Sequence, residues 1–200
     1  MKIISFEGIE GVGKSTQISM LYDLLVKKKF KVLIFREPGS TDTGEKIRNI
    51  LLNLDDSISV FSELFLMFAS RAQLIEEKIK NADCDFILLD RYYDASLAYQ
   101  GYGRGISINL INKIIKELKC PEPDSTFLLD IDPKKGFARK ANDKKDRIES
   151  SGLRFFEKVR NGYIDIAKIS NNRIKIINAE NSINEIHITI LNYLKLKPWK

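Results

Sequence analysis

The stretch Ile3-Ile4-Ser5-Phe6-Glu7-Gly8-Ile9-Glu10-Gly11-Val12-Gly13-Lys14-Ser15-Thr16 lies near the start of the chain and indicates its fold. Its first four residues form an apolar run that predicts a buried strand. Residues Gly8 to Ser15 match the pattern G-x-x-x-x-G-K-[ST]. Glycines let such a loop turn its backbone N–H groups toward phosphate oxygens, and the start of the next helix adds partial positive charge. The stretch therefore predicts a P-loop that binds ATP through residues 8–16. The alternative, a chance match in a glycine turn, is much weaker.

The end of the loop and a later strand end supply candidate ligands for the phosphates and for a metal ion. Lys14 is expected to contact the β- and γ-phosphates, and Ser15 is expected to bind Mg²⁺. Asp90 follows the apolar run Phe86 to Leu89, and a carboxylate at a strand end can hold the same Mg²⁺ through water. A surface ion pair between Asp90 and Arg91 is the alternative. We thus expect Mg²⁺ as cofactor and ATP as co-substrate.

Beyond the P-loop, short apolar runs alternate with segments of helical spacing. The predicted strands are residues 3–6, 32–35, 86–89, 127–131 and 174–177. The predicted helices are 14–29, 43–53, 60–80, 93–100, 107–118, 134–141, 152–169 and 183–195. This order predicts an α/β fold with a five-stranded parallel sheet that is flanked by helices and buried on both faces. Ligands of such folds bind at the carboxyl ends of the strands, where the motifs lie.

Length and composition suit a cytoplasmic globular protein. We expect the 200 residues to form one domain, residues 1–200, with a small mobile lid at about 133–152. No apolar run is long enough for a membrane span, and Cys84 and Cys120 are isolated, which favours a reducing cytoplasm. The net charge of +6 allows nucleic-acid binding. A lysine-rich surface with a phosphate pocket is favoured instead, so no nucleic acid and no membrane is expected as a partner.

A P-loop does not by itself name the reaction. A guanine-reading N-K-x-D sequence is absent, since residues 142–146 (NDKKD) are only superficially similar. Arginines recur where loops should converge, namely Arg36, Arg48, Arg71 and Arg91. Each alone could be a solvated side chain. Together they suit a reaction in which two phosphate groups approach each other and their repulsion must be offset by cations.

Several segments together make the sequence resemble the thymidylate kinase (dTMP kinase) family of P-loop nucleoside monophosphate kinases, almost from end to end. They are Phe6 to Thr16, Arg36-Glu37-Pro38-Gly39, Gly44-Glu45-Lys46-Ile47-Arg48, Ala69-Ser70-Arg71, Asp90-Arg91-Tyr92 and Ser96-Leu97-Ala98-Tyr99-Gln100-Gly101. The resemblance implies a Mg²⁺-dependent phosphotransferase that moves the γ-phosphoryl group of ATP to dTMP, giving dTDP and ADP in dTTP biosynthesis.

The resemblance also implies roles for residues around the acceptor's sugar and phosphate. Glu10 would accept a hydrogen bond from the 3′-hydroxyl, and Tyr99 would pack against the sugar. The acceptor's phosphate would be surrounded by Arg36, Arg48 and Arg91.

At the base, the resemblance implies that Arg71 donates to a thymine carbonyl, while Ser96 and Gln100 read the pyrimidine edge. The family usually places an aromatic residue four positions before this arginine, to stack on thymine. Here Met67 occupies that position and Phe68 follows it. Neighbours on a helix point about 100° apart, so only one of them can face the base in a regular helix. Met67, Phe68 or neither could contact thymine.

The lid segment is crowded with charges of both signs, and its alternative is a solvated helix and loop. Gly11 stands where some relatives have an arginine, which implies the bacterial-type arrangement with the catalytic cation in the lid. The candidates are Arg139, Lys140, Lys144, Lys145 and Arg147. Arg139 and the run Asp146-Arg147-Ile148-Glu149 resemble the family best, and Arg139 and Arg147 join Lys14, Glu10 and Arg91 in the expected catalytic set.

A homodimer is also implied, through the helices at 43–53 and 60–80. Its surface could come from apolar residues that could equally belong to the core, namely Leu51, Leu52, Phe61, Leu64 and Phe65.

Rival functions are a kinase for another nucleoside monophosphate, a basic nucleic-acid-binding ATPase and a regulatory module without chemistry.

Overall fold

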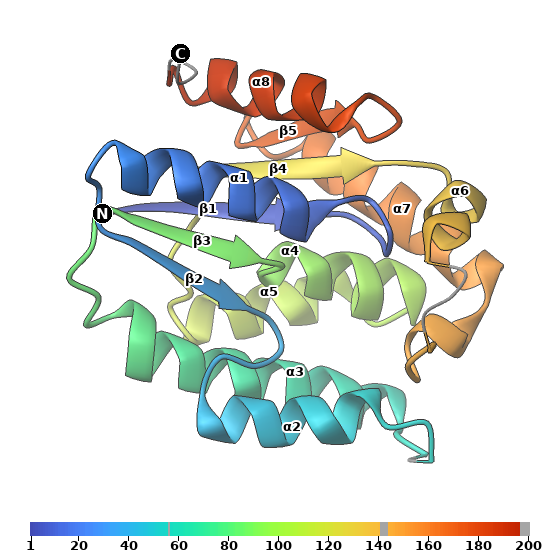
Figure 1. The fold of residues 1–200 in the computed structure, drawn as a ribbon. Coiled ribbons are helices and arrows are strands. Elements are labelled where there is room, and N and C mark those ends of the chain that lie inside the picture. The colour runs from blue at the N-terminus through green and yellow to red at the C-terminus, as the bar shows by residue number, and fades with distance from the viewer. Residues whose placement is uncertain (56, 141–143, 197–200) are drawn as a thin grey trace.

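The computed structural model describes residues 1–55, 57–140 and 144–196. Five parallel strands form one sheet in the order β2-β3-β1-β4-β5, as Figure 1 shows. Their bounds are β1 (Lys2–Glu7), β2 (Val32–Arg36), β3 (Phe86–Asp90), β4 (Ser125–Asp130) and β5 (Ile174–Asn178). The predicted α/β fold with a five-stranded parallel sheet is confirmed, and each strand lies within two residues of its expected bounds.

Helices lie on both sides of the sheet. Those before β4 are α1 (Lys14–Lys27), α2 (Asp42–Leu52), α3 (Val60–Leu74), η1 (Ile75–Ile79), α4 (Tyr93–Ser96), η2 (Leu97–Gly103) and α5 (Ile108–Glu117). Those after it are α6 (Pro133–Arg139), η3 (Glu149–Ser151), α7 (Leu153–Lys168) and α8 (Ile183–Tyr193). In Figure 1, α1 and α8 cover one face, while α4, α5 and α7 lie behind the other. The segments η1 and η2 are π-helical continuations of α3 and α4, where the ladder widens from four to five residues.

The central strand β3 shows why the sheet is a core element. Its side chains alternate between two apolar clusters, with Phe86 and Leu88 in one and Ile87 and Leu89 in the other. This alternation follows from the two-residue period of a strand. Both faces of β3 are thereby buried, as expected for the middle of a parallel sheet.

Burial on both faces does not extend to the edges of the sheet. Leu33 and Ile34 of β2 and Ile176 of β5 are exposed. These strands have a hydrogen-bonded neighbour on one side only, so fewer elements surround their side chains. The expectation that all five strands are buried on both faces is therefore wrong for β2 and β5. Within the described ranges, no helix is both long and apolar enough to cross a membrane.

Candidate active site

The phosphate loop joins the end of β1 to the start of α1. Gly13 caps α1 with φ 92°, and no side chain accepts a hydrogen bond from the first N–H groups of this helix. By contrast, α2 and α3 start with side-chain caps from Thr41 and Ser59. The first turn of a helix leaves four N–H groups without helical partners, and an anion can accept from them. The N-terminus of α1 is thus arranged for a phosphate group.

Lys14 lies over this loop. Its Nζ donates to the carbonyl oxygens of Gly8 at 3.1 Å and Ile9 at 3.0 Å. The pKa of Lys14 is lowered from 10.5 to about 8, mainly by burial and secondly by the charge of Arg91. The charges of Asp90 and Glu10 oppose this shift. A cation that is desolvated beside other cations gains strongly from an added anion.

Ser15 and Asp90 stand together at the mouth of the loop. Ser15 Oγ donates to Asp90 Oδ2 at 3.2 Å, which brings a hydroxyl and a carboxylate from α1 and β3 to one point. Mg²⁺ prefers hard oxygen ligands and is usually bound by one or two protein groups together with substrate phosphates and water. The donor set of these two residues fits that ion.

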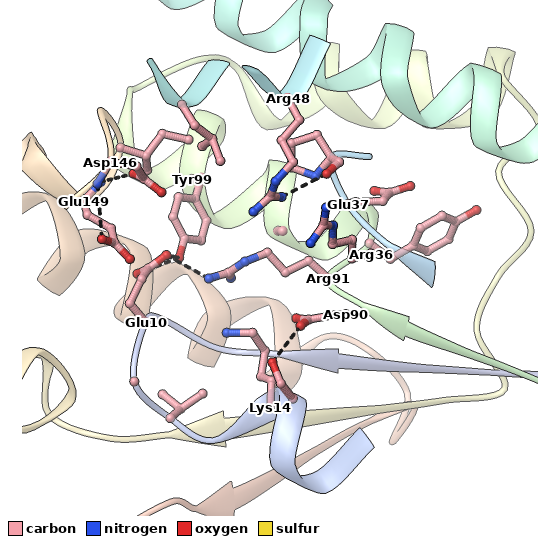
Figure 2. A pocket seen from close by; sticks show the side chains of 18 of the residues that line it. Glu10, Lys14, Arg36, Glu37, Arg48, Asp90, Arg91, Tyr99, Asp146 and Glu149 are labelled. Carbon is pink, nitrogen blue, oxygen red and sulfur yellow. Dashed lines mark hydrogen bonds and ion pairs between the residues drawn. The ribbon is translucent and has the colours of Figure 1, made fainter. Parts of the chain in front are cut away.

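One cavity of about 490 Å³ contains both predicted substrate regions. Its lining includes Glu10 to Thr16 on the phosphate-loop side and Arg36, Arg48 and Arg91 on the other side. Figure 2 shows these three guanidinium groups near one another and facing Lys14. Burial lowers the pKa of Arg48, and the nearby charges of Arg36 and Arg91 act in the same direction. Gly8 and Ile9 do not line the cavity; their carbonyls hold Lys14.

Arg91 links the two sides of the cavity. Its guanidinium donates to Gly8 O at 2.6 Å and to Glu10 Oε1 at 2.8 Å. It also lies over the ring of Tyr99, 5.0 Å from the centroid, and the Tyr99 hydroxyl donates to the same Glu10 carboxylate. The structure therefore brings together Glu10, Arg91 and Tyr99, which were predicted from separate motifs.

Glu7 and Tyr163 hold Arg91 and the backbone next to it in place. Neither residue was predicted from the sequence. Glu7 accepts from the backbone N–H of Tyr92 at 2.7 Å and from the Tyr163 hydroxyl at 2.7 Å. Tyr163 Oη in turn accepts from Arg91 Nη1 at 3.3 Å. Burial raises the pKa of Glu7 to about 8, and the charge of Asp94 adds to the rise. A glutamate at the end of an apolar strand was a signal of such a role, whereas Tyr163 had none.

Arg71 lies at the far end of the cavity and is fully buried. Its Nε donates to Glu37 Oε2 at 2.8 Å, its Nη1 to Ser96 Oγ at 3.0 Å and its Nη2 to the Tyr92 carbonyl at 3.1 Å. Burial raises the pKa of Glu37, and the Arg71 charge opposes the rise. The other oxygen of Glu37, Oε1, is buried with no hydrogen-bond partner in the described structure. Arg71, Ser96 and Glu37 thus form one polar wall, of which Glu37 was not predicted.

The structure separates Met67 from Phe68. Met67 lines the cavity, whereas Phe68 is buried in the core. The guanidinium of Arg71 lies over the Phe68 ring, 4.6 Å from its centroid. Of the two residues, Met67 is therefore the one in position to contact a bound base.

Gln100 also lines the cavity, and its Nε2 donates to Glu63 at 2.9 Å.

The lid residues divide between two places. Arg139 and Lys140 line the cavity, and Arg139 Nη2 donates to the Ala179 carbonyl at 2.9 Å. Arg147 does not line it; its Nε donates to Leu51 O and its Nη2 to Glu63 Oε2, both at 2.8 Å. The structure thus does not bring Arg147 to the other predicted catalytic residues. Lys144 and Lys145 are not among the lining residues, and residues 141–143 of the predicted lid lie outside the described ranges.

Asp146 and Glu149, both part of the run that resembles the family, also line the cavity, although no site role was predicted for either. Glu149 accepts from Lys140 in a close ion pair and from the Asp146 backbone N–H at 3.3 Å. Burial raises the pKa of Asp146. Their positions depend on how the segment folds back over the loop, and no spacing in the sequence signals it.

Comparison with known proteins agrees with this geometry. A family model described as "Thymidylate kinase" matches residues 6–190. The thymidylate kinase of Prosthecochloris aestuarii is 46% identical over 197 residues, which cover 92% of this chain and 88% of that relative. That of Thermoanaerobacter sp. (strain X514) is 41% identical and covers 97% of each chain. The crystal structure of thymidylate kinase from Ehrlichia chaffeensis superposes with a TM-score of 0.80, at 31% identity and 98% coverage of both chains.

Proposed function

The chain belongs to the thymidylate kinase family, and we propose that its cavity holds ATP on the phosphate loop and dTMP against the facing arginines. Its activity is that of a nucleoside monophosphate kinase, which moves a phosphoryl group from ATP to dTMP. The observation that carries the proposed site is that Lys14 and Arg91 line the same cavity. Two phosphorylated molecules bound to these groups would face each other, as direct transfer requires.

The acceptor would lie between the arginine group and the polar wall. Arg36, Arg48 and Arg91 would hold its phosphate, because planar guanidinium groups suit phosphate oxygens. Arg71 would donate to a thymine carbonyl beside Ser96. Met67 would pack on the base in place of an aromatic ring, through a flexible and polarizable thioether.

The sugar would lie beside Glu10 and Tyr99. The Glu10 carboxylate can accept from the 3′-hydroxyl while it keeps its bond to Arg91. The Tyr99 ring, held by its own bond to Glu10, would pack against the sugar.

Transfer would be direct and in line, with the protein positioning groups and neutralising charge. Lys14 would contact the β- and γ-phosphates, and Arg139 would bring a lid cation to the same region. Ser15 and Asp90 would hold Mg²⁺, which supplies charge neutralisation on the ATP phosphates. The segment at about 133–152 would act as the lid that excludes water from this reaction.

We also propose a homodimer formed through α2 and α3. Phe61 and Phe65 on α3 are 53% and 57% exposed, and such aromatic side chains are typical of interfaces. Leu51 and Leu64 belong instead to the buried part of the protein, and Leu52 lines the cavity.

A cytoplasmic location is in keeping with the two free thiols of Cys84 and Cys120.

A panel of acceptors tests the proposed function. With ATP and Mg²⁺, the enzyme should phosphorylate dTMP with a kcat/KM at least about tenfold above that for dCMP, dGMP or AMP, because of the polar wall. The base of dUMP has the same imide edge as thymine, so the polar wall does not separate these two acceptors. Lys14→Ala should abolish turnover with an unchanged circular dichroism spectrum, since the main phosphate cation is lost. The matched control is Lys27→Ala, an exposed lysine of the same helix. ATP hydrolysis stimulated by DNA or RNA, without a phosphorylated nucleotide product, would contradict the proposal.

A further inference from the structure

Glu63 is a buried carboxylate next to the cavity that does not line it. Only 1% of the residue is exposed. Its Oε1 accepts from Gln100 Nε2 at 2.9 Å and from Arg104 Nε at 3.2 Å. Its Oε2 accepts from Arg104 Nη2 at 3.2 Å and from Arg147 Nη2 at 2.8 Å. One carboxylate thus joins α3, η2 and the segment that returns from the lid.

The two arginines keep Glu63 ionised and in place. Burial acts to raise its pKa, but the hydrogen bonds from Gln100, Arg104 and Arg147 outweigh burial and lower the pKa below its ordinary value. Arg104 is itself fixed, because its guanidinium lies over the Phe155 ring at 4.3 Å and donates to Ser151 Oγ. The carboxylate is therefore a rigid acceptor.

An ionised carboxylate can only accept hydrogen bonds, and this decides how the Gln100 amide lies. The amide must turn its NH₂ group toward Glu63, as the 2.9 Å bond records. Gln100 lines the cavity and Glu63 does not, so Oε1 is the atom that the amide can present to a ligand there. A carbonyl oxygen at that place accepts from an N–H group and repels a second acceptor.

We propose that Glu63 is a positioning residue that fixes the Gln100 carboxamide with its oxygen toward the base and thereby selects imide bases over cytosine. The inference rests on the proposed dTMP site. Thymine carries an N3–H donor that pairs with a carbonyl oxygen. Cytosine carries an acceptor at N3, which would face the Gln100 oxygen without a hydrogen bond. Such an unpaired buried group lowers binding and rate for the wrong base.

The Glu63→Gln variant tests this inference. A neutral amide at position 63 can donate as well as accept, so the Gln100 carboxamide becomes free to turn over. We measure kcat and KM for dTMP and dCMP, with KM for ATP as a reference. The ratio of kcat/KM for dTMP to that for dCMP should fall about tenfold, through a higher KM for dTMP and a measurable rate with dCMP. The KM for ATP should stay within about twofold, because Glu63 lies on the base side of the cavity.

The control separates positioning from stability. Arg104→Met removes one cation from Glu63 but leaves the carboxylate as acceptor for Gln100, and a methionine can still lie on the Phe155 ring. It should lower the melting temperature, as Glu63→Gln does, without changing the dTMP-to-dCMP ratio. A ratio that is unchanged in Glu63→Gln, or that falls equally in Arg104→Met, would overturn the inference. A wild-type enzyme without preference for dTMP would instead overturn the proposed function.

If Glu63→Gln does not fold, Gln100→Glu gives a second reading. Its side chain has no NH₂ group to donate to Glu63 and places two acidic groups in contact, so the carboxyl that reaches the cavity is held differently. The inference expects the dTMP-to-dCMP ratio to fall in this variant as well. A ratio equal to that of the wild type would contradict the role given to the amide.

Discussion

Arg91 follows β3 with a backbone φ of 67°, a conformation that few residues with a side chain adopt. The backbone around it is held by neighbours: its own N–H donates to Phe6 O, and the next N–H, of Tyr92, donates to Glu7. Such a conformation costs on the order of 1 kcal/mol and persists only where surrounding contacts support it. Here it directs the Arg91 side chain across the phosphate loop to Glu10.

The shifted pKa of Lys14 predicts a pH dependence of ATP binding. Its amine has a pKa of about 8 in the free protein, so it is charged below pH 8 and loses its charge as the pH rises through that value. ATP binds the charged form, so the Kd for ATP should be constant up to pH 7.5 and rise by up to about tenfold per pH unit above pH 8. The ATP phosphates are already ionised in this range.

Calorimetric titration of ATP between pH 7 and pH 9.5 measures this dependence. The control is Lys14→Arg, whose guanidinium stays charged throughout, so its Kd should not rise above pH 8 even if it is weaker overall. A wild-type Kd that does not change across the range would contradict the assignment of Lys14 as the main phosphate cation.

At the scale of elements, the phosphate loop and α6 are in close contact. A Cβ added to Gly11 would lie 2.1 Å from Gly136 O, and one added to Gly136 would lie 2.6 Å from Glu10 O. Any side chain at either position would push the backbone of the phosphate loop and the backbone of α6 apart. The bacterial-type placement of the cation in the lid, inferred from Gly11, thus has a steric counterpart, since an arginine at position 11 would have no room in this arrangement.

The substitution Gly136→Ala tests whether this contact matters for catalysis. Alanine favours a helix over glycine by about 1 kcal/mol, so α6 itself should not be weakened. The added methyl group should instead hold α6 away from the loop and lower kcat by about tenfold, because Arg139 moves with the helix. Steady-state kinetics gives kcat, and Lys134→Ala on the exposed side of α6 is the control. An unchanged kcat in Gly136→Ala would show that turnover does not need the contact.

At the scale of the whole molecule, the cavity lies at the carboxyl ends of the strands, and the proposed dimer interface lies on α2 and α3. In Figure 1, α2 and α3 lie together beyond the edge strand β2, away from α1 and α8. Phe61 and Phe65 are paired on α3, with ring centroids 6.3 Å apart. Met67 and Arg71 lie further along the same helix, so an interface on α3 would also steady the base end of the cavity.

The proposed dimer predicts the effect of a charge on this surface. Wild-type enzyme should sediment as a dimer at micromolar concentration, and Phe65→Glu should sediment as a monomer, because a carboxylate would be buried without a partner. Ile169→Glu is the control, since Ile169 is 78% exposed and follows α7, which lies outside the proposed interface. If the wild type is monomeric, or if Phe65→Glu remains dimeric, the interface is misplaced.

Much of the fold and of the nucleotide site follows from local sequence. Residues 8–15 define a loop whose glycines and lysine act over a few neighbouring positions, so their arrangement hardly depends on the rest of the chain. The alternation of apolar runs and helical segments likewise determines a parallel sheet, because each crossover must return to the same edge. Glu63, Met67 and Arg71 also share a spacing of four, which places them on one helix face and was a readable signal for Glu63.

Other features were decided only by tertiary structure. Whether Met67 or Phe68 faces the base, and whether Arg147 reaches the phosphates or Glu63, depends on how α3 is rotated and on where the lid segment returns. The exposure of β2 depends on its place in the strand order. Periodicity gives the relative directions of side chains on one element, while the direction in which that element faces is set by long-range packing against elements distant in sequence.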